Sequence, residues 1–71
     1  MLLLTQGGEI VNLDRMAIID TSSLQVFAKQ DTHGRGITLG EYDSEERCKE
    51  VVEDIFDCVN WKANTYRMPE E

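Results

Sequence analysis

Aromatic and basic side chains stand close together at two places in the chain, and this combination suits binding of a phosphorylated base. Phe27 and Lys29 have the two-residue spacing that puts both on one face of a strand, and Tyr66 directly precedes Arg67. A third cation, Arg35, lies in the glycine-bearing turn at 33–36, whose backbone N–H groups can also face an anion. Rings stack on bases and cationic groups pair with phosphate, so these five residues are the candidates for ligand binding. The alternative for Arg35 is ordinary exposed surface in a hairpin.

Residues for nucleophilic catalysis are scarce. A nucleophile needs a base within hydrogen-bond reach, and His33 carries the only imidazole of the chain. Cys48 and Cys58 both fall in a predicted helix, where packing is the simpler role for each. Carboxylate pairs such as those at 45–46 and 53–54 follow a helix surface and are expected to aid solubility. We predict that the protein is not an enzyme.

Residues for metal binding are also poorly spaced. Asp14, Asp20 and Asp31 each follow an apolar run, in the position where Asp side chains cap turns. They lack the one-residue alternation of a calcium loop, and the chain has no Cys-x-x-Cys or Cys/His spacing for zinc. No metal or other cofactor is therefore expected.

The candidate residues must be positioned by strands in the first part of the chain. Turn residues separate five short apolar runs, at 2–5, 9–13, 16–19, 24–29 and 37–42. Connections this short allow hairpins and exclude parallel crossovers, so an antiparallel meander of about five strands is expected. In the fourth run Leu24, Val26 and Ala28 share one face, and Phe27 and Lys29 lie on the other.

The apolar period changes to 3.6 after residue 42 and predicts one helix from about 44 to 59. Asp43 is the expected N-cap, with Glu46 completing a capping box. Residues 65–68 are a possible short final strand that Pro69 ends. The fold class is therefore α+β, with a single domain over 1–71 and a helix whose apolar stripe packs on the sheet. Phe56 is expected at the edge of this stripe. The stripe itself consists of Cys48, Val51, Val52, Ile55 and Val59.

Net charge and hydropathy limit the possible partners. Fourteen acidic against seven basic residues give a net charge of −7, which argues against binding duplex nucleic acid or an anionic membrane over a broad face. No apolar run is long enough to span a bilayer, and the start of the chain lacks the features of a secretion signal, so a cytoplasmic protein is expected. Residues 1–40 hold four acids and three bases (−1), and residues 41–71 hold ten acids and four bases (−6). An anionic ligand is therefore expected on the sheet, its loops or the C-terminal end.

The small size of the chain favours self-association. A domain of 71 residues buries only about 60% of its unfolded surface, and small domains compensate with disulfides, metals or partners. Cys48 and Cys58 lie ten residues apart on one predicted helix, roughly 15 Å, whereas a disulfide tolerates about 7 Å at most. We therefore predict a homo-oligomer.

Three short motifs together resemble those of a group of small phage and prophage proteins of low-GC Gram-positive bacteria. The motifs of that group can be written roughly as I-N-L-D, L-G-x-Y-x-[ST]-E-E and Y-x-M-P. In this chain the corresponding stretches are 10–14, 39–46 and 66–70. The layout is also similar to that of the Thoeris anti-defence sponges, phage proteins that sequester cyclic ADP-ribose isomers and in some cases cyclic oligonucleotides. This chain departs from the sponges in being shorter and in having one predicted helix, so pockets that need a second helix are in doubt.

The resemblance implies a non-catalytic oligomer that captures a small cyclic nucleotide at subunit boundaries. Aromatic stacking on the base and cations on the phosphates would then come from Phe27, Lys29, Arg35, Tyr66 and Arg67. An alternative from the residues themselves is a protein–protein inhibitor of a host defence enzyme. It would act through the acidic helix face or an exposed strand edge. A third possibility is a phage accessory domain without a defined activity.

Overall fold

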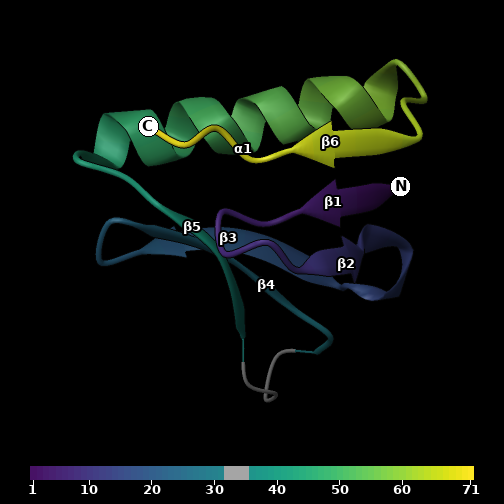
Figure 1. Ribbon diagram of the computed structural model, residues 1–71, viewed down its shortest axis with the longest axis horizontal. Coiled ribbons are helices and arrows are strands. Elements are labelled where there is room, and N and C mark those ends of the chain that lie inside the picture. Colours follow the sequence, from purple (N-terminus) through teal and green to yellow (C-terminus); the bar gives the residue numbers. More distant parts are fainter. Residues whose placement is uncertain (32–35) are drawn as a thin grey trace.

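The computed structural model describes residues 1–31 and 36–71, and it confirms an α+β fold with one C-terminal helix packed on β-sheet (Figure 1). His33 and Arg35 lie outside the described residues. Within the described part of the chain, no helix is long and apolar enough to cross a membrane. The elements in chain order are β1 (Leu2–Leu4), β2 (Ile10–Asn12), a 3-10 helix η1 (Leu13–Arg15), β3 (Ile18–Ser22), β4 (Gln25–Lys29), β5 (Ile37–Glu41), α1 (Glu45–Asn60) and β6 (Thr65–Arg67).

The strands form two three-stranded sheets, in the orders β2-β1-β6 and β3-β4-β5. Among themselves the first five strands pair only as antiparallel hairpins, as their short connections predict, but β2 does not pair with β3, so the expected meander is divided between two sheets. The final strand differs from an antiparallel meander, because β6 pairs parallel to β1, with Leu3 opposite Tyr66. A parallel pair needs a long crossover, and the chain between β1 and β6, which includes α1, provides it. This pairing places the first and last strands side by side, whereas the N- and C-terminal ends lie at opposite sides of the view (Figure 1).

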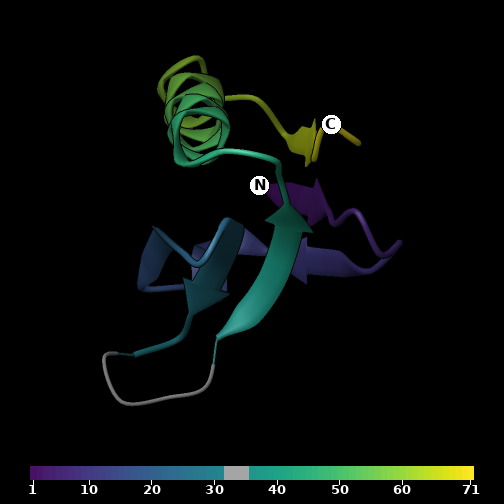
Figure 2. The same ribbon diagram turned by 90° about the vertical axis from the view of Figure 1, so that its left-hand side faces the viewer.

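The hydrophobic core lies between the two sheets and the helix. α1 packs against β3 and β4, and it meets the other sheet through Tyr66 of β6 (Figure 2). Each layer contributes fully or almost fully buried side chains to this core: Leu3 and Val11 from the first sheet, Val26, Ala28 and Leu39 from the second, Cys48, Val51 and Ile55 from the helix, and Tyr42 and Met68 from the segments that follow β5 and β6.

Strand β3 lies further along the chain than the sequence predicts. The expected run at 16–19 ends at Asp20, whereas the strand extends to Ser22, so Asp20 lies in its middle. The turn between β3 and β4 consists of Ser23 and Leu24, both with positive φ (52° and 64°), as in a two-residue hairpin turn. Leu24, expected on the buried face of the fourth strand, is therefore a turn residue and is 41% exposed.

A β-bulge in β5 changes the expected alternation of that strand. Val26 pairs with Gly40 and Phe27 pairs with Thr38, so Leu39 has no partner opposite it on β4. Leu39 is nevertheless fully buried, and Gly40 beside it is buried as well.

The helix begins at Glu45, and its N-cap is Ser44 rather than Asp43. The Ser44 hydroxyl accepts a hydrogen bond of 3.1 Å from the Arg47 backbone N–H. The capping box predicted from Asp43 is therefore wrong by one residue. Serine and aspartate are comparable N-cap residues, so their intrinsic preference does not distinguish adjacent candidates, and the path of the chain out of β5 decides between them.

The helix ends at Asn60 in a Schellman motif. The Lys62 N–H donates to the Val59 carbonyl (3.0 Å) and the Ala63 N–H donates to the Cys58 carbonyl (2.9 Å). Lys62 occupies the left-handed position of this motif, with φ of 58°, where glycine is the usual residue. The apolar stripe of the helix is buried only at Cys48, Val51 and Ile55. Val59, which was expected to continue it, is 55% exposed, and Phe56 is 70% exposed.

The side chain of Gln6 joins the two sheets to the C-terminal tail. Its Oε1 accepts from the Glu41 N–H at 2.7 Å, and its Nε2 lies 2.9 Å from the Pro69 carbonyl and 3.1 Å from that of Glu41. The Tyr42 hydroxyl donates to the same Pro69 carbonyl at 2.8 Å. We call Gln6, Tyr42 and Pro69 the tail clamp. Gly40 lies directly beneath it, because a Cβ at this position would come within 2.9 Å of the Tyr42 hydroxyl.

Candidate functional site

The structure divides the predicted ligand-binding residues between the two sheets. Phe27 and Lys29 lie on β4, in the β3-β4-β5 sheet, whereas Tyr66 and Arg67 lie on β6, in the other sheet. Arg35 lies outside the described residues. The two described pairs line different depressions of the surface.

The first pair forms a small aromatic and cationic surface on the outer face of β4. Val26 and Ala28 point into the core and are fully buried, whereas Gln25, Phe27 and Lys29 alternate with them and are half-buried on the other face. The Lys29 Nζ lies 5.1 Å from the centre of the Phe27 ring, within the range of a cation–π contact. The prediction that these two side chains share one face is confirmed.

Strand pairing adds polar groups on both sides of the Phe27 ring. Asp20 on β3 and Thr38 on β5 are its direct cross-strand partners, and paired residues project from the same face of a sheet. The Thr38 hydroxyl lies 3.5 Å from Gln25 Oε1, and Gln25 Nε2 donates to the Glu41 carboxylate at 3.0 Å. The ring therefore has a hydroxyl, an amide and an ammonium group around it, and Asp20, its partner on β3, accepts a hydrogen bond of 2.8 Å from the Thr21 N–H.

The resulting depression has a volume of about 280 Å³ and is open to solvent. Gly36 forms part of its wall. A Cβ at this position would lie 3.2 Å from Phe27 Cδ2, so a larger residue would crowd the ring, whereas its 3.5 Å approach to Lys29 Cγ is an ordinary contact. Among the described residues we call Asp20, Phe27, Lys29, Thr38 and Gln25 the β4 face.

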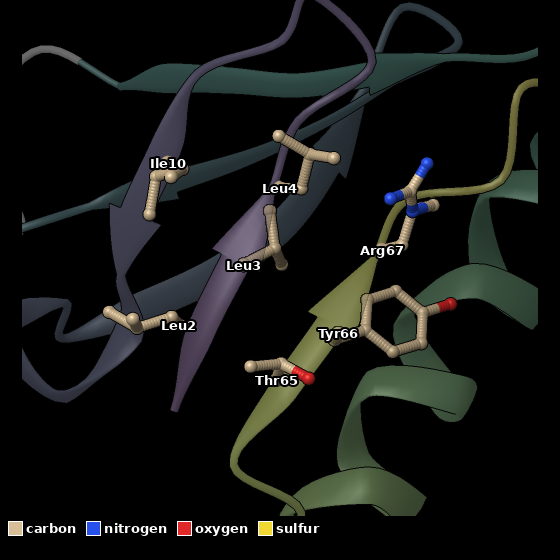
Figure 3. A pocket seen from close by; sticks show the side chains of 7 residues that line it. All are labelled: Leu2, Leu3, Leu4, Ile10, Thr65, Tyr66 and Arg67. Carbon is tan, nitrogen blue, oxygen red and sulfur yellow. The ribbon is translucent and has the colours of Figure 1, made fainter.

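Tyr66 and Arg67 do not form the aromatic and cationic pair that their adjacency predicts. Neighbouring residues of a strand project to opposite faces, so applying this rule to the predicted strand at 65–68 separates them from sequence alone. The Tyr66 ring turns towards α1, where its hydroxyl donates to the Asp54 carboxylate at 3.3 Å (Figure 3). Burial, together with Asp54, raises the pKa of the Tyr66 phenol well above its ordinary value. The ring therefore packs between sheet and helix.

Arg67 projects from the outer face of the β2-β1-β6 sheet, where it is exposed. It lines a depression of about 320 Å³ with the aliphatic side chains Leu2, Leu4 and Ile10 and with Thr65 (Figure 3). The guanidinium of Arg67 forms no hydrogen bond or ion pair with any described residue.

The cysteines lie outside both depressions in which the predicted ligand residues are found. Cys48 is buried in the core, and this burial raises the pKa of its thiol, with Glu45 adding to the effect. Both cysteines are free thiols. No three His, Cys, Asp or Glu residues within 1–31 and 36–71 are grouped so that they could hold a metal ion. Asp14 lies in η1 and Asp20 within β3, so the three aspartates do not end three successive strands as the sequence suggests.

Sequence reasoning identified Phe27 and Lys29 but missed Asp20, Thr38 and Gln25. Aspartate is a residue type common in turns, and the position of Asp20 opposite Phe27 depends on the register of β3. Thr38 reaches its place through the bulge in β5. Both positions depend on strand pairing, which the local pattern of residues does not specify.

Comparison with known proteins adds no relative: no family model, no curated protein and no solved structure matches this chain. The resemblance to small phage proteins therefore remains an expectation that depends on its three short motifs.

Proposed function

We propose that the protein binds and sequesters a cyclic nucleotide immune signal without cleaving it, in the cytoplasm of a phage-infected host cell. The ligand is held on the β4 face. The observation that carries this proposal is the half-buried Phe27 ring with the Lys29 ammonium 5.1 Å from its centre and with Asp20 and Thr38 paired on either side.

Each group of the β4 face has a defined task towards a nucleotide. A base stacks on the exposed part of the Phe27 ring, an interaction of about 1–3 kcal/mol per base. Lys29 pairs with a phosphate. Asp20 accepts hydrogen bonds from an exocyclic amino group or a ring N–H of the base, while Thr38 and Gln25 supply further polar contacts. This face belongs to the part of the chain with a net charge of −1, where an anion is repelled least.

The chemistry of this face favours capture over cleavage. Its described members include no thiol and no imidazole, and Asp20 and Lys29 are its only ionisable groups. Neither is bonded to a hydroxyl in the manner of an activated nucleophile. The bound molecule is therefore expected to remain intact.

One open depression contacts a ligand from one side only. Capture with high affinity needs most of the ligand surface to be covered. We therefore propose that copies of the chain associate, so that the ligand is enclosed by more than one subunit.

Isothermal titration with a panel of cyclic ADP-ribose isomers and cyclic di- and trinucleotides tests the proposal. We expect binding of at least one member, with affinity lowered about 5- to 150-fold by Phe27→Ala, as expected for the loss of one stacked base. Lys29→Ala should also weaken binding and reduce its salt dependence. Lys49→Ala, which removes an exposed lysine of the helix, is the matched control and should bind as the unchanged protein does.

The fate of the ligand provides the second readout. After denaturation of the complex, chromatography and mass spectrometry should recover the bound molecule unchanged. Absence of heat with every member of the panel would remove the proposal, and recovery of a cleaved product would show an enzyme instead.

A second candidate function is inhibition of a host defence enzyme through the acidic side of α1. Glu46, Glu50, Glu53 and Asp57 are all exposed and fall on the side of the helix away from its buried stripe. Combined charge reversal at Glu50, Glu53 and Asp57 would abolish such inhibition and leave nucleotide binding unchanged, whereas Phe27→Ala would do the opposite. Plating of phage carrying each variant on defended cells separates the two functions.

A further inference from the structure

Three polar side chains form a hydrogen-bonded chain along one side of the Phe27 ring. Gln25 Nε2 donates to the Glu41 carboxylate at 3.0 Å, and the Thr38 hydroxyl donates to Gln25 Oε1 at 3.5 Å. Gln25 and Thr38 line the depression beside the ring, whereas Glu41 lies outside it. Glu41 is the direct cross-strand partner of Gln25, so both side chains project from the same face of the sheet. The carboxylate therefore meets the ligand site only through the Gln25 amide.

Glu41 determines which end of the Gln25 amide faces Thr38. An ionised carboxylate only accepts hydrogen bonds, so the amide presents its nitrogen to Glu41 and its oxygen to Thr38. Turning the amide over would break a charge-assisted hydrogen bond and would place Oε1 against the carboxylate. An amide without such a partner can offer either end to a ligand, and Gln25 lacks this freedom.

The backbone of Glu41 is fixed by the tail clamp. Gln6 Oε1 accepts from the Glu41 N–H at 2.7 Å, and Gln6 Nε2 donates to the Glu41 carbonyl at 3.1 Å. The side chain of Glu41 thus projects from a backbone that is bonded on both sides of its Cα. This attachment favours a position of the carboxylate within reach of Gln25.

The polar atoms that remain free on this side of the ring are mainly acceptors. The Thr38 hydroxyl uses its proton on Gln25 and keeps its lone pairs, and Gln25 Oε1 keeps a second lone pair. The remaining N–H of Gln25 belongs to the nitrogen on the Glu41 side. The Ser22 hydroxyl, which also lines the depression, can donate or accept and does not discriminate. A base stacked on Phe27 therefore meets two neighbouring acceptors at this edge.

We propose that the site selects adenine through its amino group at C6, and that Glu41 is the positioning residue that sets this preference. The inference rests on the proposed function and names the base that the same site takes. The amino group donates to Gln25 Oε1 and to the Thr38 oxygen. A keto oxygen at C6 would instead face two acceptors, and the amide could meet it only by giving up its bond to Glu41. The site thus disfavours the keto base in addition to binding the amino base.

The layout of β4 suits a nucleotide in this orientation. Gln25 and Lys29 lie on opposite sides of Phe27 along the strand, each about 7 Å away at the usual rise of a strand. The amino edge of the base then meets Gln25, while a phosphate meets the Lys29 ammonium at the other end of the ring. Different residues bind the amino group and the phosphate, so a change in base preference need not abolish phosphate binding.

Isothermal titration with matched ligands tests the inference. The pairs are cyclic ADP-ribose with cyclic IDP-ribose and cyclic di-AMP with cyclic di-IMP, which carry an amino or a keto group at C6. For the unchanged protein we expect the amino member of at least one pair to bind about tenfold or more tightly than its keto partner, as for one mismatched buried hydrogen bond. In Glu41→Gln the ratio should fall to about threefold or less, because the new amide both donates and accepts and allows Gln25 either orientation.

Glu9→Gln is the matched control for the loss of a negative charge. Glu9 is exposed and lines the depression between β5 and the segment that joins β1 to β2. Within 1–31 and 36–71 its carboxylate has no hydrogen bond or ion pair. Both variants remove one negative charge and should favour every anionic ligand slightly, but Glu9→Gln should keep the ratio of the unchanged protein.

Gln25→Leu provides a second variant that acts on the amide itself. It removes both ends of the amide and leaves the Phe27 ring and Lys29 in place, so the two members of a pair should bind with similar affinity. Circular dichroism checks that Glu41→Gln and Gln25→Leu retain the fold. A loss of stability alone would lower the affinity for both members together, whereas the ratio reports the orientation of the amide.

Three results would overturn the inference while the proposed function stands. The two members of each pair could bind equally, or the keto member could bind more tightly. The ratio could be the same in Glu41→Gln and in the unchanged protein, which would assign the preference to Asp20, the acceptor on the β3 side of the ring. Other members of the panel could bind while neither adenine ligand does. Absence of binding by every ligand would overturn the proposed function together with this inference.

Discussion

Replacement of Gly40 by alanine should destabilise the protein by about 2–3 kcal/mol, because the tail clamp leaves no space for a Cβ. The added atom would lie 2.9 Å from the Tyr42 hydroxyl and 3.0 Å from Gln6 Cδ. Neither group can move freely, since the hydroxyl donates to Pro69 at 2.8 Å and Gln6 accepts from the Glu41 N–H at 2.7 Å. Displacement weakens two hydrogen bonds of about 1 kcal/mol each and adds overpacking, which costs about 1 kcal/mol or more.

Urea and thermal unfolding followed by circular dichroism measure this effect. For a domain of this size the loss corresponds to a fall in Tm of roughly 10–20 °C. Gly7→Ala is the matched control, because its Cβ would meet only the Thr5 hydroxyl, at 3.8 Å. The control should be neutral or slightly stabilising.

The clamp also predicts how two substitutions combine. Gln6→Ala removes one of the groups that Gly40→Ala would strike, so the added cost of Gly40→Ala should be smaller in that background. Equal stability of Gly40→Ala and the unchanged protein, with additive effects in the double variant, would refute the role assigned to the clamp.

Two further predictions concern the helix end and the phenol beside it. Lys62→Gly should stabilise the protein by about 1 kcal/mol, since Lys62 has φ of 58°, whereas Lys62→Ala should bring no such gain; equal melting temperatures for both variants would contradict the strain argument. The raised pKa of Tyr66 means that the folded state favours the neutral phenol. Its stabilising contribution is complete below the unfolded pKa of about 10 and is lost as the pH rises above it. Unfolding titrations above pH 10 should therefore show a shallower loss of stability for Tyr66→Phe, and parallel curves would argue against this coupling.

The motifs that carry the resemblance to phage proteins have structural roles in this chain. Tyr42 belongs to the tail clamp, Gly40 lies beneath it, and Ser44 caps the helix. Met68 is buried in the core, and the carbonyl of Pro69 receives the clamp hydrogen bonds. The second and third motifs thus meet in space although they are far apart in sequence. The residues of these motifs stabilise the fold. The motifs therefore do not indicate the ligand, which is inferred from the β4 face.

The two pairs of predicted ligand-binding residues lie on different sheets. The β4 face lies on the β3-β4-β5 sheet, whereas Arg67 lies on the β2-β1-β6 sheet. Arg67 was predicted to bind ligand, and titration of Arg67→Glu with a bound nucleotide shows whether it contributes from a second copy.

Local patterns in the sequence determined the class of fold and part of the candidate site. Periods of 2 and 3.6 depend only on neighbouring residues, so they identified the strands and the helix to within a few residues. The same local rule placed Phe27 and Lys29 on one face. Applied to a strand that begins at residue 65, the same rule also places Tyr66 and Arg67 on opposite faces.

Only the tertiary structure decided which distant segments meet. The parallel pairing of β6 with β1, the place of Asp20 opposite Phe27 and the contact of Tyr66 with Asp54 all join residues from separate elements. Many pairings bury a similar amount of apolar surface, so hydrophobic pattern alone does not select among them. The selection depends on register, on the bulge in β5 and on the hydrogen bonds of the tail clamp, which form only when the whole chain is folded.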